Sequence, residues 1–187
     1  RALRINDRTT DEIRRWACAE LEGREIDDLD GNLDSLRGYR SLTHGDAPEL
    51  VQSDSLEEDA KHILALLRQW DGGAQQEARR ICVTARTNED LNALVAALEQ
   101  RGVACPELDH STPDDPSVAG IRLATMHRVK GLEFDIVVIA AYRGTRHYAA
   151  QLSRDEDAGV ADDMETAERC LLHVAATRAK RHLFLLQ

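Results

Sequence analysis

Short runs of consecutive apolar residues stand out along the chain, and most are followed by a segment with helical spacing. The clearest run is Phe134 to Ala140, in which every residue except Asp135 is apolar. Such a run is too continuous to alternate between a buried and an exposed face, so both faces of the strand should be covered. Shorter runs, and a weak alternation near the middle, predict further strands at 49–54, 81–85, 121–125 and 183–186.

Four segments carry apolar residues at helical spacing. Thr9 forms a capping-box pattern with Glu12 at the start of the first segment, and Asn88 is the expected cap of the third. The predicted helices run from Thr9 to Gly23, from Ser55 to Asp71, from Asn88 to Gly102 and from Asp162 to Ala179. Strands that alternate with helices indicate a doubly wound α/β domain with a mostly parallel sheet.

Length and composition fit one globular domain. Of the 187 residues, 42% are hydrophobic and 4% are aromatic, so the core should consist mainly of aliphatic side chains. The four cysteines form no CxxC pair, and we expect reduced, mostly buried thiols and no zinc site. The sequence shows no signal peptide and no apolar stretch of ~20 residues, so we expect a cytoplasmic protein.

The charge balance is acidic. A formal net charge of −10 argues against a domain that clamps nucleic acid over its whole surface, but it leaves room for local phosphate contacts. Acidic residues concentrate at 20–34 and at 155–168. The simplest interpretation of both segments is a solvated face or loop.

The chain lacks the motifs of a self-sufficient enzyme. It contains no GxxxxGK[ST] loop, so it cannot hold a triphosphate in the P-loop manner. It also lacks the Ser/His/Asp and Cys/His orders that are typical of hydrolases. We therefore expect the isolated chain to be inactive.

A polar and basic segment, 125–135, joins two of the predicted strands. Thr125 and His127 could hydrogen-bond phosphate oxygens at a strand end, where ligands bind in open α/β sheets. Gly131 allows the backbone to approach a ligand closely, and Glu133 precedes a mostly apolar run and needs a partner. The alternative is a surface turn in which Glu133 pairs with a nearby arginine.

Two arginines fit the same chemistry. Arg178 lies in a predicted helix among small alanines, where it is either part of a buried ion pair or a phosphate-binding group. Arg8 stands just before a helix N-terminus, where the helix dipole does not favour a cation, which indicates a role elsewhere. The alternative for Arg8 is an ordinary exposed side chain.

The order and spacing of these segments resemble the C-terminal motor domain of the UvrD/Rep/PcrA helicases of superfamily 1. Residues 125–135 are similar to motif V of that family, TxHxxKGLEF, and residues 172–179 are similar to motif VI, YVAxTRA. Residues 6–9 resemble motif IV, NYRT, and residues 81–88 end in the RTN of motif IVa. The resemblance implies one RecA-like, P-loop NTPase-type domain over residues 1–187, with a mostly parallel sheet flanked by helices.

This resemblance implies a nucleotide site that is shared with a second domain. Arg8 and Arg178 look like the arginines that reach the γ-phosphate, and Glu133 looks like the carboxylate that accepts a ribose hydroxyl. Lys130 and Gly131 resemble motif V residues beside the nucleotide phosphates. ATP and Mg²⁺ would be held mainly by an N-terminal RecA-like domain of the same protein, and we expect the chain to be part of that longer protein.

The same resemblance implies contacts with single-stranded DNA. Thr125 and His127 look like the residues that touch the DNA backbone, and Arg86 and Asn88 look like residues that face the strand. Contacts with phosphates carry no sequence information. The DNA structure on which the protein acts is therefore left open.

Three features depart from the pattern of the family. Asp7 stands where an aromatic residue stacks on the base, and His173 stands where motif VI begins with Tyr. Only residues 101–120 occupy the place of the large accessory insertion, which is missing. These departures leave three alternatives open: a helicase-like interaction module in a regulatory or defence protein, part of a RecB-like helicase–nuclease, and a stand-alone nucleotide-binding domain.

Overall fold

A five-stranded, fully parallel sheet forms the centre of the computed structural model, with the strand order β3-β7-β6-β4-β5. The strands are β3 (Glu49–Val51), β4 (Ile81–Ala85), β5 (Arg122–Thr125), β6 (Phe134–Ile139) and β7 (Ala179–Leu186). All five predicted strands are therefore present. The structure describes residues 5–6, 8–24, 40–70, 80–106, 108, 115, 118, 120–154 and 158–187.

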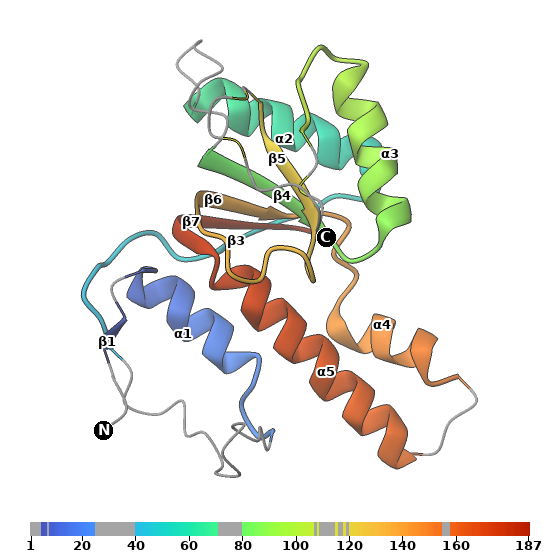
Figure 1. Ribbon diagram of the computed structural model, residues 1–187. Coiled ribbons are helices and arrows are strands. Elements are labelled where there is room, and N and C mark those ends of the chain that lie inside the picture. Colours follow the sequence, from blue (N-terminus) through green and yellow to red (C-terminus); the bar gives the residue numbers. More distant parts are fainter. Residues whose placement is uncertain are drawn as a thin grey trace.

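Helices cover both faces of this sheet (Figure 1). On one face, α2 (Leu56–Trp70) packs against α3 (Asn88–Glu99), and on the other, α1 (Asp11–Ala19) packs against α5 (Ala158–Ala176). A further helix, α4 (Thr145–Leu152), lies along α5 and was not predicted from the sequence. The α/β architecture with a parallel sheet confirms the predicted RecA-like fold class.

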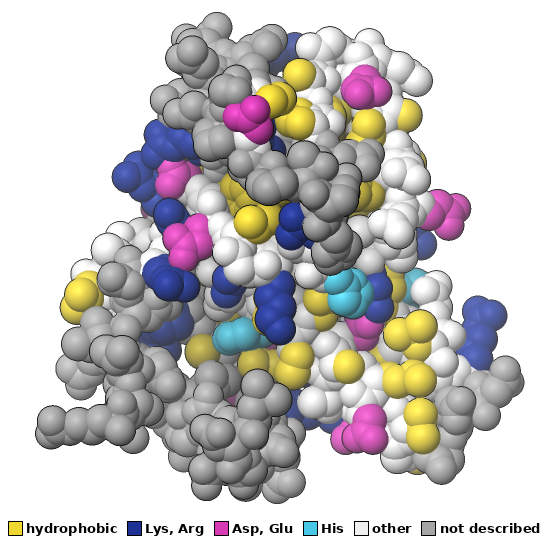
Figure 2. Space-filling model, viewed as in Figure 1, with side chains coloured by type: hydrophobic (Ala, Val, Ile, Leu, Met, Phe, Trp, Pro, Cys, Tyr) yellow, Lys and Arg dark blue, Asp and Glu magenta, His cyan; other side chains and the backbone are white. Residues whose placement is uncertain are grey.

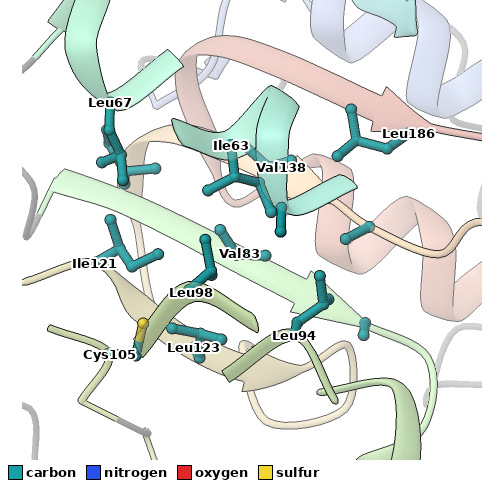
Figure 3. Close-up of a cluster of buried hydrophobic side chains, with 14 of the residues drawn as sticks. Ile63, Leu67, Val83, Leu94, Leu98, Cys105, Ile121, Leu123, Val138 and Leu186 are labelled. Carbon is teal, nitrogen blue, oxygen red and sulfur yellow. The ribbon is translucent and has the colours of Figure 1, made fainter. Parts of the chain in front are cut away.

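The apolar runs supply side chains to two separate cores. Figure 3 shows the cluster on the side of α2 and α3, where Ile63, Leu94 and Leu98 from the helices meet Val83 and Val138 from the strands. The intervening residues of the same strands belong to a second cluster, on the side of α1 and α5. The central strands are thus buried on both faces, as their continuous apolar character requires.

Two helix caps were predicted one residue away from the caps that the structure shows. Thr10, not Thr9, caps α1, because its side chain accepts a hydrogen bond from the Ile13 backbone N at 3.5 Å. Thr9 instead donates its hydroxyl to the Ala179 carbonyl at 2.5 Å, which ties the start of the chain to β7. Thr87, not Asn88, caps α3. In both cases a threonine in extended conformation directly precedes the first helical residue.

The end of α5 differs from its prediction. The helix was expected to continue to Ala179, but it ends at Ala176, and Ala179 pairs with Phe134 as the first residue of β7. Arg178 therefore lies in the turn between the helix and the strand rather than on the helix. The local pattern of small and basic residues favours a helix, but the hydrogen bonds of β7 with β6 extend the strand to this point.

The open side of β5, at one lateral side of the sheet, is covered by the chain segment that precedes β5 in the sequence. The backbone N of Leu123 donates to Pro106 O at 3.2 Å, and the N of Leu108 donates to Leu123 O at 2.8 Å. Gly120 permits this close approach, because its φ is +114° and an added Cβ would lie 2.3 Å from a carbonyl oxygen of the covering segment.

Two very short strands, β1 (Ile5–Asn6) and β2 (Arg40–Ser41), form a separate parallel pair near the start of α1. Asp7, the departure in the motif IV segment, lies outside the described residues. All four cysteines are free; Cys82 and Cys105 are buried, whereas Cys18 and Cys170 are partly exposed. Within the described ranges, every helix is too short or too polar to cross a membrane.

Candidate functional site

The motif V segment runs from one end of the parallel strands to the other. It begins at their carboxyl ends, which form the carboxyl edge of the sheet, and it ends at their amino ends, which form the amino edge. β4 pairs Ala85 with Thr125 of β5, and it pairs Ile81 with Ile136 of β6. Thr125 therefore lies at the carboxyl edge, whereas Glu133 precedes β6 at the amino edge. The polar residues of this segment therefore do not all lie at one strand end. The crossover carries the chain back across the sheet between β5 and β6, because parallel strands start at the same edge.

Glu133 forms an ion-paired cluster at the amino edge. Its Oε1 lies 3.2 Å from Nε of Arg8, and its Oε2 lies 3.1 Å from Nζ of Lys180. The pairing of Glu133 with a nearby arginine was one of the two interpretations of the sequence, and it is confirmed. The partner, Arg8, is one of the two arginines that the sequence singled out for phosphate contacts. The ion pair therefore contains two of the predicted site residues.

Backbone contacts hold the cluster in place. Arg8 precedes Thr9, whose hydroxyl is bound to Ala179 O, while the N of Phe134 donates to Arg178 O at 3.0 Å. The first residues of β6 and β7 and the start of α1 therefore converge at one point. Lys180, which the sequence did not single out, reaches Glu133 because it follows Ala179 on β7.

Arg178 lies beside this cluster and is half-buried. Its Nε donates to Val174 O at 3.0 Å, and its Nη2 donates to Thr177 Oγ1 at 3.2 Å. Burial lowers the pKa of Arg178, Glu133 raises it and Arg8 lowers it further. The Arg178 guanidinium is therefore close enough to Glu133 and Arg8 for the charges of both to affect its pKa. The described contacts hold the side chain through neutral oxygens, which leaves its charge available to an anion.

A pocket of about 410 Å³ adjoins the cluster and shares Arg8 and Lys180 with it. His44, Arg181 and His182 also line this pocket. Figure 2 shows Lys and Arg side chains gathered across the middle of one face of the molecule, with histidine side chains among them. The acidic net charge of the chain thus coexists with local basic surface.

The carboxyl edge carries the residues expected to contact DNA. Thr125 is partly exposed at the end of β5, and His127 is exposed in the crossover that follows. Asn88 is exposed in the first turn of α3. Lys130 and Gly131 are also exposed, farther along the crossover, and Gly131 has a φ of +86°. The functional roles of all these residues stay predictions.

Arg86 follows β4 at the same edge, but its side chain is directed into the protein. Its Nε donates to Glu168 Oε2 at 2.7 Å, and its Nη2 pairs with Oε1 of the same carboxylate. The Tyr148 ring of α4 lies 5.7 Å from the guanidinium carbon. The side chains of Arg86 and Glu168 are only 17% and 7% exposed. The hydrogen bonds to Glu168 raise the pKa of Arg86, and the predicted DNA contact of this arginine stays untested.

The acidic segment 155–168 is more than a solvated face. Glu165 accepts hydrogen bonds from Nε and Nη2 of Arg169 at 3.0 and 2.7 Å, and it pairs with Arg24 at 3.0 Å. The hydrogen bond from Arg169 lowers the pKa of Glu165 despite some desolvation. In the part of the segment that the structure describes, carboxylates thus fasten α5 to its neighbours. Periodicity could not predict this, because Arg24 and Arg86 are distant in sequence.

His173, the second departure from the family pattern, is a packing residue. Its Nδ1 donates to Ala17 O of α1 at 2.9 Å, and burial lowers its pKa. The imidazole therefore joins α5 to α1. Among the described residues, no group of three or more His, Cys, Asp or Glu side chains is arranged to hold a metal ion.

The five-stranded parallel sheet flanked by helices on both faces is the architecture of a RecA-like domain. A solved structure with this fold is the C-terminal domain of a possible DNA helicase from Lactobacillus plantarum WCFS1. It superposes with a TM-score of 0.62 at 19% identity, over 97% of this chain and 86% of that one. At this level of identity, the match concerns the fold.

Sequence comparison points to the same class of protein. Residues 106–187 match the family model of the UvrD-like helicase C-terminal domain. A relative, "Putative ATP-dependent DNA helicase YjcD" of Bacillus subtilis (strain 168), is 41% identical over 69 residues, which are 35% of this chain and 9% of that protein. The chain thus matches about a tenth of the length of this relative. The motif IV and IVa segments, 6–9 and 81–88, lie outside the family match and stay predictions.

Proposed function

We propose that the chain is the second motor domain of an ATP-dependent DNA helicase or translocase. In this role Arg8 and Arg178 contact the γ-phosphate of a nucleotide held by another RecA-like domain, and Glu133 accepts a ribose hydroxyl. The observation that carries the proposal is the convergence of Arg8, Glu133, Arg178 and Lys180 at the amino edge of the sheet, in a chain with a UvrD-like C-terminal domain.

The charge of the cluster suits a polyphosphate. Three cationic side chains surround one carboxylate, so the cluster carries a formal excess of positive charge. The Arg8 side chain is 69% exposed, and an ion pair at such a site contributes only about 0–1 kcal/mol. A phosphate oxygen can therefore replace Glu133 as the partner of Arg8 at little cost, and it frees the carboxylate for a hydroxyl group.

The chemistry that these residues would assist is phosphoryl transfer. ATP supplies the transferred phosphoryl group, and Mg²⁺ neutralises part of its charge when both are bound by the partner domain. Negative charge spreads over the phosphoryl oxygens in the transition state, and an arginine there is worth about 10³–10⁵ in rate. Arg178 suits this task because neighbouring neutral oxygens orient its guanidinium before an anion arrives.

Single-stranded DNA is the proposed ligand of the carboxyl edge. Thr125 and His127 are exposed at this edge and can contact phosphate oxygens. The two ligands would occupy opposite edges of one sheet, so neither blocks access to the other. If His127 contacts DNA, His127→Ala weakens binding of single-stranded DNA regardless of sequence, and His44→Ala, an exposed histidine at the amino edge, does not. Equal effects of both variants in fluorescence anisotropy would contradict this assignment.

The arginine assignment is tested by the ATPase activity of the intact protein, with and without single-stranded DNA. We expect Arg178→Ala to lower the kcat of DNA-stimulated hydrolysis about 10³-fold or more. Arg101→Ala is the matched control, because Arg101 pairs with Glu57 on the α2 and α3 side of the sheet. Unchanged kcat in the Arg178 variant would show that this arginine does not serve phosphoryl transfer.

A further inference from the structure

We propose that Arg86 acts as a positioning residue, through Glu168, and not as a direct ligand of DNA. This inference rests on the proposed function. The Arg86–Glu168 pair would couple the predicted DNA edge to the predicted nucleotide edge, because it clamps α5 to the strand ends at one edge while the same helix leads to Arg178 at the other.

The geometry of the pair is that of a rigid clamp. Arg86 presents two guanidinium nitrogens to the two oxygens of Glu168, an arrangement that fixes orientation as well as distance. Both side chains are largely buried, and the Tyr148 ring covers the guanidinium. A side chain held in this way is not presented to a DNA backbone in solution.

Tyr148 extends the clamp to a second strand. Its hydroxyl donates to Ala141 O at 2.8 Å, directly beyond the end of β6. The same Ala141 has a φ of +52°, and its N donates to the buried carboxylate of Asp59 at 2.7 Å. A non-glycine residue in this conformation persists only where its surroundings hold it. The ends of β4 and β6, α4 and α5 are therefore fastened at one place.

This clamp lies next to the predicted DNA contacts. The residue before Arg86, Ala85, pairs with Thr125, and Met126 N donates to Ala85 O at 3.0 Å. A phosphate bound by Thr125 would thus contact the strand end to which the clamp is attached. The predicted DNA ligand can alter the clamp without touching Arg86.

At its other end, α5 leads to the predicted nucleotide site. Eight positions separate Glu168 from Ala176, the last residue of α5, which corresponds to about 12 Å along the helix. Arg178 lies two residues beyond the helix end and bonds back to Val174 O of the last turn. A shift of α5 along its axis would therefore displace the Arg178 guanidinium relative to Glu133 and Arg8. A clamp that holds α5 in place would also hold the Arg178 guanidinium in place.

The decisive variants are Glu168→Gln and Arg86→Lys in the intact protein. Each keeps a side chain of similar length but loses the charged, two-pronged pair. We expect both to fold, to bind single-stranded DNA within about twofold of the unchanged protein, and to lose at least about tenfold of the DNA stimulation of kcat. Glu168→Gln should lower hydrolysis without DNA much less than it lowers the DNA-stimulated rate, because Glu168 touches no reacting group. The exchanged pair Arg86→Glu with Glu168→Arg should restore part of the stimulation.

Each contrary outcome overturns the inference in a distinct way. If Arg86 binds DNA directly, Arg86→Ala weakens DNA binding and reduces its salt dependence by about one phosphate contact, while Glu168→Gln keeps full stimulation. A purely structural pair would lower Tm together with all activities, and the exchanged pair would restore them in parallel. If the unchanged protein shows no DNA stimulation, the proposed function and the clamp fail together. If Arg178→Ala abolishes stimulated hydrolysis but Glu168→Gln does not, only the clamp fails.

Discussion

At the scale of single residues, the carboxylate of Glu133 holds the cationic side chains of Arg8 and Lys180 together at the amino edge of the sheet. Arg8, Glu133 and Arg178 were selected by residue type and position, and the structure brings them to one edge of the sheet. Lys180 and Glu168 were not singled out. Their partners, Glu133 and Arg86, are 47 and 82 positions away in sequence, and no local pattern carries such pairings.

Glu133→Gln tests the ribose contact. A hydrogen bond to a charged group is worth about 1.5–3 kcal/mol, so the KM for ATP should rise about 10- to 100-fold in the intact protein. We expect a smaller change in kcat, because the ribose is bound alike in the ground state and the transition state. Glu57→Gln, on the other side of the sheet, is the control. A loss confined to kcat would assign Glu133 to the reacting phosphoryl group instead.

At the scale of helices and strands, continuous apolar runs predicted the central strands of the main sheet, because burial on both faces leaves a strong signal in the sequence. The strand β3, which is largely exposed, was predicted from a weak alternation. Helix boundaries were less predictable. Thr9 and Asn88 were each chosen as caps one residue from the observed Thr10 and Thr87, since several adjacent residues can accept the same backbone hydrogen bond. Helix α4 begins after Gly144 without a side-chain cap, so its start has no sequence signature.

The observed cap of α3 makes a specific prediction for stability. Thr87 accepts a hydrogen bond from the Asp90 backbone N at 3.1 Å, so Thr87→Ala should lower the free energy of unfolding by about 1 kcal/mol. Asn88→Ala removes an exposed side chain in the first helical turn and should change it by less than about 0.5 kcal/mol. Urea denaturation of the 187-residue chain measures both. A larger loss of stability in Asn88→Ala than in Thr87→Ala would show that Asn88 is the cap of α3.

At the scale of the whole molecule, the sheet separates two sets of residues that the sequence presents as one motif. Thr125 and Glu133 are close in sequence but lie at opposite edges. The fold class followed from alternating strands and helices, and the resemblance to the helicases followed from motifs V and VI. The placement of Thr125 and Glu133 at opposite edges did not follow from the sequence, because it depends on which strands are neighbours in the sheet. In the proposed function, the chain is half of a motor, and its cationic edge completes a nucleotide site on another domain.

This central claim is tested most directly by the affinity of the intact protein for ADP with aluminium fluoride, a mimic of the transferring phosphoryl group, compared with ADP alone. Groups that act on the transition state bind such a mimic more tightly than the product. We predict that the unchanged protein shows this preference and that Arg178→Ala reduces it by at least about 10²-fold while the Kd for ADP stays the same. An Arg178→Ala protein that keeps the full preference would contradict the account.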